Sequence, residues 1–445
     1  MENEKKVFSD EIGYLHRMLR KDEFNMQTPT LHKSTELYRL DNGLRVIIRH
    51  VAGLESVAIV LGVNYGSIDD SEEKNGTAHY LEHMLFRGTK NNSWKDISNI
   101  LKDIGGYWNA NTDFEVTLFY IEVHKSQMEK ATKIIADIMQ NATISKDSME
   151  TERKVIMAEN RDDDLYLQNK ITISLIRSIF QKYPVVLPIG GSNDKSLLKI
   201  TREDLDASYK KYYNSNNMVL AIYGGVKKNE TIELIRKYFS NLNGNGIELK
   251  RSTCKEKQIK DSKNINLYGF DKNVAAIGRG FMVEGLIDNP EEYAQLKVFH
   301  TLLQNRIYEE IREKKGLSYS PNIDVAIQST FGYIIISAVI NSERIKEAND
   351  VLDKELQKFE EGKIDSKEIK IAKQQTYFRS KMAFDYIPEM PISLVVNELT
   401  MHKYYLPLIR PILIKNVSDE DIKKLCRKYI KLENAATITV VSSHN

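Results

Sequence analysis

The sequence predicts an α+β protein made of two homologous αβ domains, each a mainly antiparallel sheet with helices on one face. Three observations lead to this prediction. Two stretches of the chain repeat each other, strands in each half are followed by runs of helices, and 445 residues are too many for one hydrophobic core. The repeat has a shift near 220 residues, far longer than the ~20–50 residues of a solenoid, so it indicates a duplicated domain.

The repeat is clearest in two segments that each combine a helix with a strand. Residues 199–223, KITREDLDASYKKYYNSNNMVLAIY, match residues 415–441, KNVSDEDIKKLCRKYIKLENAATITVV, at a shift of 217. In each copy a Thr or Ser N-cap precedes an acidic first turn and a short helix, and a β-rich apolar run follows. Residues 144–156 resemble residues 364–376 at a shift of 220.

The polar segment 243–264, NGNGIELKRSTCKEKQIKDSKN, is the predicted linker between the two copies. It separates a first αβ domain at 35–242 from a second at 265–445. Residues 1–34 are predicted to be an N-terminal extension, either a charged helix or a partly ordered arm.

The elements of the first half follow in chain order. Residues 36–51 predict a β-hairpin that turns at Asn42-Gly43, and residues 56–66 predict the next strand. A helix is expected from about Ala78, with Asn75 or Thr77 as its N-cap. The later elements are a helix near 94–104, strands within 106–123, and helices near 125–140 and 146–180.

Composition narrows the class of protein. Lys and Arg (64) nearly balance Asp and Glu (62), so the net charge of +2 gives no reason to expect nucleic acid or an anionic membrane as partner. No apolar run approaches the ~18 residues of a membrane span. The two cysteines are far apart, and the N-terminal residues lack a signal core and are too acidic for a transit peptide. We therefore expect the cytoplasm, with an organellar matrix as the alternative.

The segment HYLEHMLFRGT, residues 79–89, carries the strongest chemical signal. His79 and His83 are one helical turn apart on the same face, a spacing at which two imidazoles can bind one Zn²⁺ ion. Glu82 leans to the same side, where it could take a proton from a water bound to that ion. The alternative interpretation is an ordinary buried helix whose histidines are hydrogen-bonded. Of nine histidines in the chain, no other two lie within five residues of each other, which favours the metal site.

A catalytic zinc site needs a third protein ligand and one open position. The candidate segment is METERKVIMAENRDDD, residues 149–164, in which Glu152 and Glu159 are seven residues apart and so share a helix face. Val155 and Ile156 lie between them, and carboxylates on such a face are costly to bury unless they have a partner. The alternative is a solvated acidic face that continues into the aspartates that follow.

These motifs resemble the inverzincin metallopeptidases, the family of pitrilysin, insulin-degrading enzyme and mitochondrial processing peptidase, whose signature is H-x-x-E-H. The resemblance covers about residues 35–442. It implies one zinc per chain, held by His79, His83 and a distant glutamate that corresponds to Glu159, 76 residues after His83. It also implies that Glu82 is the general base and that Glu152 is a second glutamate close to the site.

Two further segments carry the resemblance. GGYWNANTDFEVTLFY, residues 105–120, is similar to the family's active-site edge strand, which implies that Trp108, Asn109 and Ala110 pair with substrate backbone by strand addition. Without this resemblance, the segment would be interpreted as an ordinary strand with a polar outer face.

The other segment is RIYEEIREKKGLSYS, residues 306–320. The resemblance matches Arg312 and Tyr319 to an arginine and a tyrosine that reach the substrate carbonyl, where such donors stabilise the tetrahedral oxyanion. The spacing alone predicts only a helix that ends at Gly316.

The function expected from the sequence is a zinc-dependent endopeptidase or oligopeptidase that hydrolyses peptides or unfolded segments inside a closed chamber. The resemblance implies that this chain is one half-shell of that chamber, so we expect a homodimer or a heterodimer with a related subunit. The first rival is a catalytically inactive partner or scaffold subunit, although every expected ligand and Glu82 are present. The second is a structural zinc or metal-storage module, which would need a fourth protein ligand.

Overall fold

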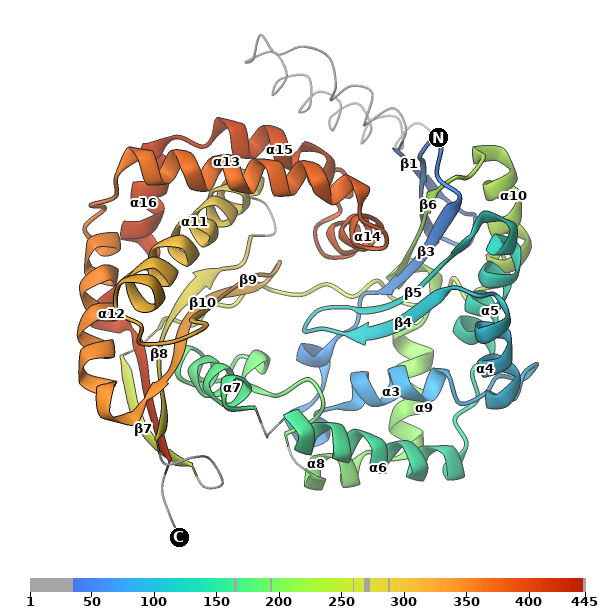
Figure 1. The fold of residues 1–445 in the computed structure, drawn as a ribbon. Coiled ribbons are helices and arrows are strands. Elements are labelled where there is room, and N and C mark those ends of the chain that lie inside the picture. The colour runs from blue at the N-terminus through green and yellow to red at the C-terminus, as the bar shows by residue number, and fades with distance from the viewer. Residues whose placement is uncertain are drawn as a thin grey trace.

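The computed structural model contains two β-sheets, one in each half of the chain, with helices around them (Figure 1). The predicted N-terminal extension lies outside the part of the chain that the structure describes. The described residues are 35–163, 166–192, 194–258, 260–267, 273–286 and 289–442.

The first sheet has six strands in the order β1-β2-β6-β3-β5-β4. Neighbouring strands are antiparallel except β2 and β6, which are parallel. Leu40 and Leu44 close the predicted hairpin, where Gly43 adopts a φ of 95° that favours glycine. The strands are β1 (Thr35–Arg39), β2 (Arg45–His50), β3 (Ser56–Val63), β4 (Tyr107–Thr112), β5 (Thr117–His124) and β6 (Met218–Gly224).

The second sheet repeats this order without an equivalent of β1. Its five strands run β7-β11-β8-β10-β9, and β7 and β11 are the parallel pair. The order therefore matches β2-β6-β3-β5-β4 strand for strand, which confirms the predicted pair of similar αβ units. The strands are β7 (Asp261–Leu267), β8 (Val274–Glu284), β9 (Asn322–Ile327), β10 (Phe331–Asn341) and β11 (Ala436–Ser442).

The repeated capping sequences form equivalent helices. Thr201 caps α9 (Arg202–Tyr212) and Ser418 caps α16 (Asp419–Tyr429), each in a capping box. β6 follows α9 and β11 follows α16. The strand of each repeat therefore occupies the equivalent position in its own sheet.

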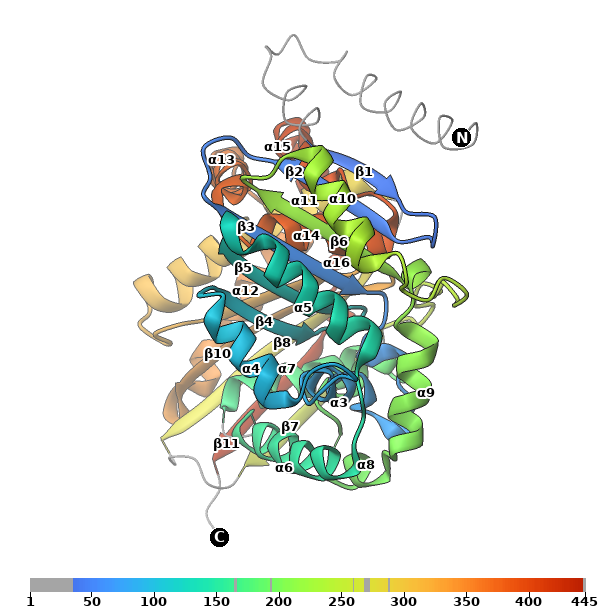
Figure 2. The same cartoon turned by 90° about the vertical axis from the view of Figure 1, so that its right-hand side faces the viewer.

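The remaining helices lie mainly on the outer side of the two sheets, as Figures 1 and 2 show. The single helix predicted over 146–180 is wrong, because the chain forms two helices there, α6 and α7. Within the described residues, no helix combines the length and apolar character that crossing a bilayer requires. The helices of the first half are α3 (Thr77–Leu85), α4 (Trp94–Asp103), α5 (Met128–Asn141), α6 (Lys146–Asp163), α7 (Leu167–Ile179), α8 (Asp194–Lys199) and α10 (Lys228–Phe239). Those of the second half are α11 (Pro290–Tyr308), α12 (Ile345–Glu360), α13 (Ser366–Met382), α14 (Glu389–Met401) and α15 (Leu406–Asn416).

Each half also sends one helix to the sheet of the other half. α7 packs on β8, β10 and β11, and α14 packs on β3 and β6 (Figure 1). Glycines allow the close approach, because a Cβ at Gly62 would lie 2.5 Å from Val395 and one at Gly278 would lie 2.7 Å from Leu175. Both faces of the central strands are therefore buried, which explains why β3 and β6 are almost uniformly apolar.

Candidate metal centre and active site

The helix that carries the histidine motif is anchored at its start by a side chain from a preceding turn. The Asp70 carboxylate accepts hydrogen bonds from the backbone N–H groups of Gly76 (2.9 Å) and Ala78 (3.2 Å) and from the Tyr65 hydroxyl (2.8 Å). The predicted N-cap, Asn75 or Thr77, is wrong, because the N-cap is Gly76, at a φ of 99°, and it has no side chain. A carboxylate at this helix end also interacts favourably with the helix dipole.

α6 packs beside α3 through contacts that involve no metal. The Tyr80 hydroxyl donates to the backbone carbonyl of Met149, and the Arg153 guanidinium lies 5.4 Å from the centre of the Tyr80 ring. Arg153 also donates to the carbonyl of Ile200 at 3.0 Å. The two helices that bear the candidate ligands are thus held together by packing and hydrogen bonds.

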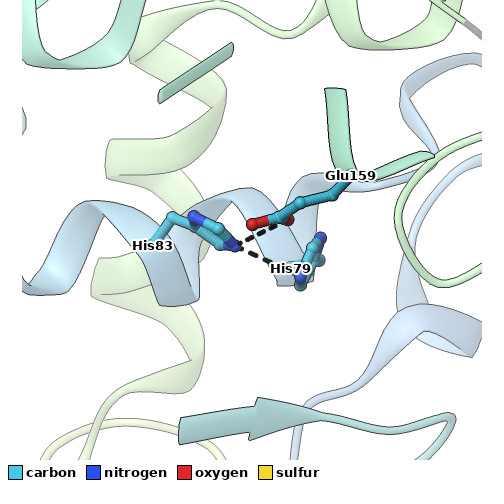
Figure 3. Close-up of side chains that lie close together, drawn as sticks. All are labelled: His79, His83 and Glu159. Carbon is cyan, nitrogen blue, oxygen red and sulfur yellow. Dashed lines mark hydrogen bonds and ion pairs between the residues drawn. The ribbon is translucent and has the colours of Figure 1, made fainter. Parts of the chain in front are cut away.

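This packing brings the three predicted zinc ligands together (Figure 3). His83 Nε2 lies 3.3 Å from His79 Nε2 and 3.5 Å from Glu159 Oε2. Among the described residues, these three side chains form the one group of His, Cys, Asp and Glu donor atoms that could hold a metal ion, with all ligand atoms within 4.8 Å of one another. The Glu159 side chain is 48% exposed, which leaves one side of the group open to solvent.

The donor set fits a zinc ion. Two donors, each about 2.0–2.1 Å from a tetrahedral zinc, lie about 3.3–3.4 Å apart, close to the two separations given above. Two imidazole nitrogens whose lone pairs face each other at 3.3 Å repel unless a proton or a cation lies between them. Two imidazoles and one carboxylate with an open fourth position are typical of catalytic rather than structural zinc.

Glu152 contacts a histidine rather than the space between the ligands. Its side chain is 2% exposed, and its Oε2 lies 3.1 Å from His83 Nδ1. Arg87 forms an ion pair with the same carboxylate. A proton on His83 Nδ1 that is donated to Glu152 leaves the Nε2 lone pair free to bind a metal, the usual tautomer of a metal-bound histidine.

The two histidines differ in electrostatic environment. Burial, together with the neighbouring His83, lowers the pKa of His79 to about 3, so His79 is a neutral imidazole at physiological pH. Burial also lowers the pKa of His83, but the contacts with Glu152, Glu159 and Glu82 outweigh it and raise that pKa overall. The carboxylates around His83 thus favour positive charge at this position.

Replacing Glu152 by Ala is expected to weaken zinc binding by about 10- to 100-fold, because metal sites commonly lose this much when a residue that orients a ligand is removed. The variant leaves His83 Nδ1 and Arg87 without their shared acceptor. Competition against a zinc chelator measures the affinity. Asp147→Ala is the matched control, since Asp147 lies on the same helix and is exposed. Equal affinities for the two variants would contradict the role assigned to Glu152.

Glu82 projects from α3 on the side of the edge strand β4. Its side chain is buried, and its Oε2 accepts a hydrogen bond of 2.6 Å from the hydroxyl of Thr112, the last residue of β4. Burial raises the pKa of Glu82, and the Thr112 hydrogen bond opposes that shift. The carboxylate is thus held in one orientation and is more basic than an exposed glutamate.

The predicted substrate-binding residues lie on β4, which forms one edge of the first sheet. The amide of Ala110 donates to the side chain of Asn109 at 2.9 Å, so this group faces away from β5. The Trp108 ring is 39% exposed and lies 5.3 Å from the Phe86 ring of the motif segment. The structure therefore places an accessible strand edge alongside α3.

Arg312 and Tyr319 are not brought to the histidines in this chain. The Arg312 guanidinium stacks on the rings of Tyr308 (4.8 Å) and Tyr319 (4.3 Å), and Tyr319 is 82% exposed. Among the described residues, no hydrogen bond, ion pair or ring contact joins the side chains of Arg312 and Tyr319 to α3 or α6. Arg312 lies in a π-helical segment, Glu309–Lys314, that continues α11, on the other half of the molecule from α3 (Figure 1).

Three residues of the site were not predicted from the sequence: Asp70, Arg87 and Thr112. Arg87 lies four residues after His83, so helical spacing could have suggested a shared face. Thr112 lies within the segment that resembles the family's edge strand, but nothing in the spacing indicates that it meets Glu82. Asp70 precedes α3 by too many residues to be read as an ordinary N-cap.

Known families match most of the chain. Residues 45–193 match the model described as insulinase, peptidase family M16, and residues 199–376 match the model described as the peptidase M16 inactive domain. The second match begins before α9 and continues into the second sheet.

Individual relatives agree with these matches. The chain is 28% identical to a protein of Rickettsia felis named an uncharacterized zinc protease, over 89% of this chain and 95% of that one. It is 30% identical to a probable mitochondrial-processing peptidase subunit beta of Arabidopsis thaliana, over 60% of this chain and 50% of that one.

Solved structures share the fold. A protease from Helicobacter pylori superposes with a TM-score of 0.82 at 19% identity, over 91% of this chain and 99% of that one. A peptidase M16 inactive domain from Pseudomonas fluorescens gives a TM-score of 0.80 at 18% identity, over 92% and 98%. With both family models matched in succession and the fold shared along almost the whole chain, this protein belongs to peptidase family M16.

Proposed function

We propose that this protein is a zinc-dependent endopeptidase or oligopeptidase that hydrolyses peptides and unfolded segments inside a closed chamber. The observation that carries the proposal is the convergence of His79, His83 and Glu159, with the buried Glu82 on the same helix as the histidines. The relatives named zinc proteases support the same activity.

In this proposal His79, His83 and Glu159 hold one zinc ion per chain. The ion supplies Lewis acidity, which polarises a peptide carbonyl and lowers the pKa of water from 15.7 to about 7. Glu82 takes a proton from the attacking water molecule and later passes it to the leaving amine. The Thr112 hydroxyl, 2.6 Å from Glu82, keeps that carboxylate oriented during both transfers.

Substrate binding is proposed to use the free edge of β4. An extended peptide added beside Trp108, Asn109 and Ala110 would form main-chain hydrogen bonds, a mode that is tolerant of side chains. The Ala110 amide, which the Asn109 side chain satisfies in this structure, would then donate to a substrate carbonyl. Strand addition requires an extended peptide, which supports unfolded segments rather than folded proteins as substrates.

A second half-shell is proposed to complete the site. Arg312 and Tyr319 are expected to stabilise the oxyanion, yet in one chain they lie on the half without the histidines. A second chain facing the first could place its own arginine and tyrosine over the zinc site. The partner would be another copy of this 51.3 kDa chain or a related subunit. One relative is named a probable mitochondrial-processing peptidase subunit beta, which supports a related subunit as the partner.

The alternative proposal is an inactive partner subunit of such an assembly. One of the structures with the same fold is called an inactive domain, so the fold alone does not decide between them. The complete donor set and the buried Glu82 favour the enzyme.

The functional test compares an unfolded substrate with its folded form. The protein is expected to cleave reduced, carboxymethylated lactalbumin and to leave the native, disulfide-bonded protein intact, because only extended chain can pair with β4 and enter a chamber. Mass spectrometry of the products gives the cleavage sites. Equal cleavage of both forms would contradict the chamber, and cleavage of neither would favour the inactive subunit.

Mixing two inactive variants is expected to restore activity if the second half-shell is another copy. Arg312→Ala should lower kcat by about 10²- to 10³-fold through loss of an oxyanion donor. A dimer of one Arg312→Ala chain and one Glu82→Gln chain contains one intact site, so a statistical mixture should recover about a quarter of wild-type turnover. The control is a mixture of His83→Ala and Glu82→Gln. Both residues belong to α3, so each site of a mixed dimer lacks one of them and no recovery is expected. No recovery in the first mixture would contradict a shared site between identical chains.

A further inference from the structure

The turn between β4 and β5 contains a buried carboxylate that contacts the other half of the molecule. Glu115 is 1% exposed. It accepts hydrogen bonds from the backbone N–H groups of Ser329 (3.1 Å) and Thr330 (3.0 Å) and from both of their hydroxyls, that of Ser329 at 2.8 Å. All four donors come from the turn between β9 and β10. A carboxylate that is buried this completely needs such donors, so the two turns are firmly joined.

The same turn is held from its other side by the segment that precedes α3. The backbone N–H groups of Ser67 and Ile68 donate to the carbonyls of Asp113 and Phe114, both at 3.1 Å. The approach is so close that a Cβ at Gly66 would lie 2.4 Å from the Phe114 carbonyl oxygen. The turn is therefore clamped between the segment that precedes α3 and the second half of the chain.

Arg251, from the connection between the halves, reinforces this clamp. Its guanidinium donates to the Asp69 carboxylate at 2.8 Å, to the Asn64 side chain at 2.6 Å and to the backbone carbonyl of Glu115 at 2.7 Å. Arg251 and the Asp69 carboxylate are both largely buried, with side chains 10% and 9% exposed. Three separate segments thus determine where the β4–β5 turn lies.

The clamp matters for the chemistry because of the residue at the end of β4. Thr112, three residues before Glu115, donates to Glu82 at 2.6 Å and is itself buried. A shift of the turn would move the Thr112 hydroxyl away from Glu82. Glu115 has no contact with the histidines or Glu159, so any effect on catalysis passes through this turn.

We propose that Glu115 is a positioning residue for the general base: by fixing the β4–β5 turn to Ser329 and Thr330, it holds Thr112 against Glu82. The inference rests on the proposed role of Glu82. It gives the second half, which carries none of the predicted metal ligands, an indirect part in the reaction. Removing the clamp is expected to leave zinc binding intact and to lower kcat.

The test is a double-mutant cycle of Glu115→Gln and Thr112→Val. Each single variant is expected to lower kcat by about 10- to 100-fold, the scale of loss from a misplacement of about 1 Å, with zinc content unchanged. Because Glu115 acts through Thr112, the double variant should be no slower than the slower single variant. Effects that multiply would overturn the inference.

Amide hydrogen exchange of the metal-free protein gives a readout that does not depend on activity. In Glu115→Gln, exchange over residues 107–117 is expected to be about 10-fold faster because the turn is released. Glu398→Gln is the matched control: Glu398 is 3% exposed and also joins the two halves, through an ion pair of 3.1 Å with Arg45 on β2, but it is not connected to the base. Unchanged exchange over 107–117, or an equal loss of kcat in the control, would overturn the inference.

Two further outcomes are distinguishable. If the wild-type protein shows no zinc-dependent turnover, the proposed function fails and this inference fails with it, whereas multiplying effects in an active enzyme overturn the inference alone. If Glu115→Gln does not fold, Ser329→Ala takes its place in the cycle, since it removes one of the four donors and leaves the carboxylate. It is expected to give a smaller loss of kcat that is likewise absent in the Thr112→Val background.

Discussion

Glu82→Gln is expected to keep its zinc and to lose about 10²- to 10⁴-fold in kcat, the range that a general base contributes. The amide has the shape of the carboxylate and can still accept the hydrogen bond from Thr112, but it cannot take a proton from water. The three predicted zinc ligands are untouched, so the metal should stay. Zinc content by atomic spectroscopy and steady-state kinetics on an unfolded peptide measure the two parts of the prediction.

The control for this substitution is Glu73→Gln. Glu73 lies just before α3, its side chain is 67% exposed, and it pairs with Lys199 at 3.0 Å. The same chemical change there should leave kcat within a factor of about two, because exposed ion pairs contribute little. Full turnover in Glu82→Gln would show that the base is wrongly assigned. Loss of zinc in that variant would show that Glu82 belongs to the metal site itself.

Removal of zinc is expected to abolish turnover while the protein stays folded. The contacts of Tyr80 that join α3 to α6, with Met149 and with Arg153, involve no ligand atom, and Asp70 anchors the start of α3. We therefore expect the protein to fold without the metal, unlike a protein with a structural site, whose binding energy is folding energy. Circular dichroism should show an unchanged helix content after treatment with a chelator.

Removal of zinc should change the stability of the protein as removal of any bound ligand does. Zinc at 1,000 times its Kd would stabilise the folded state by about 4 kcal/mol through mass action, so removal should lower Tm without removing the cooperative transition. Activity should return when one equivalent of zinc per chain is added back. Glu159→Gln is the matched variant and should require more zinc for the same recovery. Unfolding on chelation would instead favour the structural zinc module.

Local signals in the sequence predicted much of this molecule. The Asn42-Gly43 turn, the N-caps Thr201 and Ser418, and the apolar pattern of each single strand or helix are each contained within a few residues. The shift near 220 residues predicted two similar αβ units, and the strand orders of the two sheets confirm it. The pairing of α3 with α6 followed from the resemblance to the family, since nothing in the spacing brings residue 159 to residue 83.

Other features depended on packing between distant segments. Neither half contains a signal that α7 covers the second sheet and α14 covers the first, because an apolar helix face is compatible with either sheet. The helix break after α6 was missed because residues 146–180 contain no glycine or proline that would signal it. The N-cap of α3 was missed because Asp70 reaches it from a preceding turn.

The sequence by itself determined the fold class, the duplication and the three candidate zinc ligands with their base. These are encoded in residue type and in spacing along one helix or one strand, or in their likeness to a family. Only the tertiary structure decided that Thr112 orients Glu82, that Glu152 contacts both His83 and Arg87, and that Glu115 joins the two halves. The physical reason is that such contacts join side chains 30 or more positions apart, and their geometry exists only once the sheets and helices have packed.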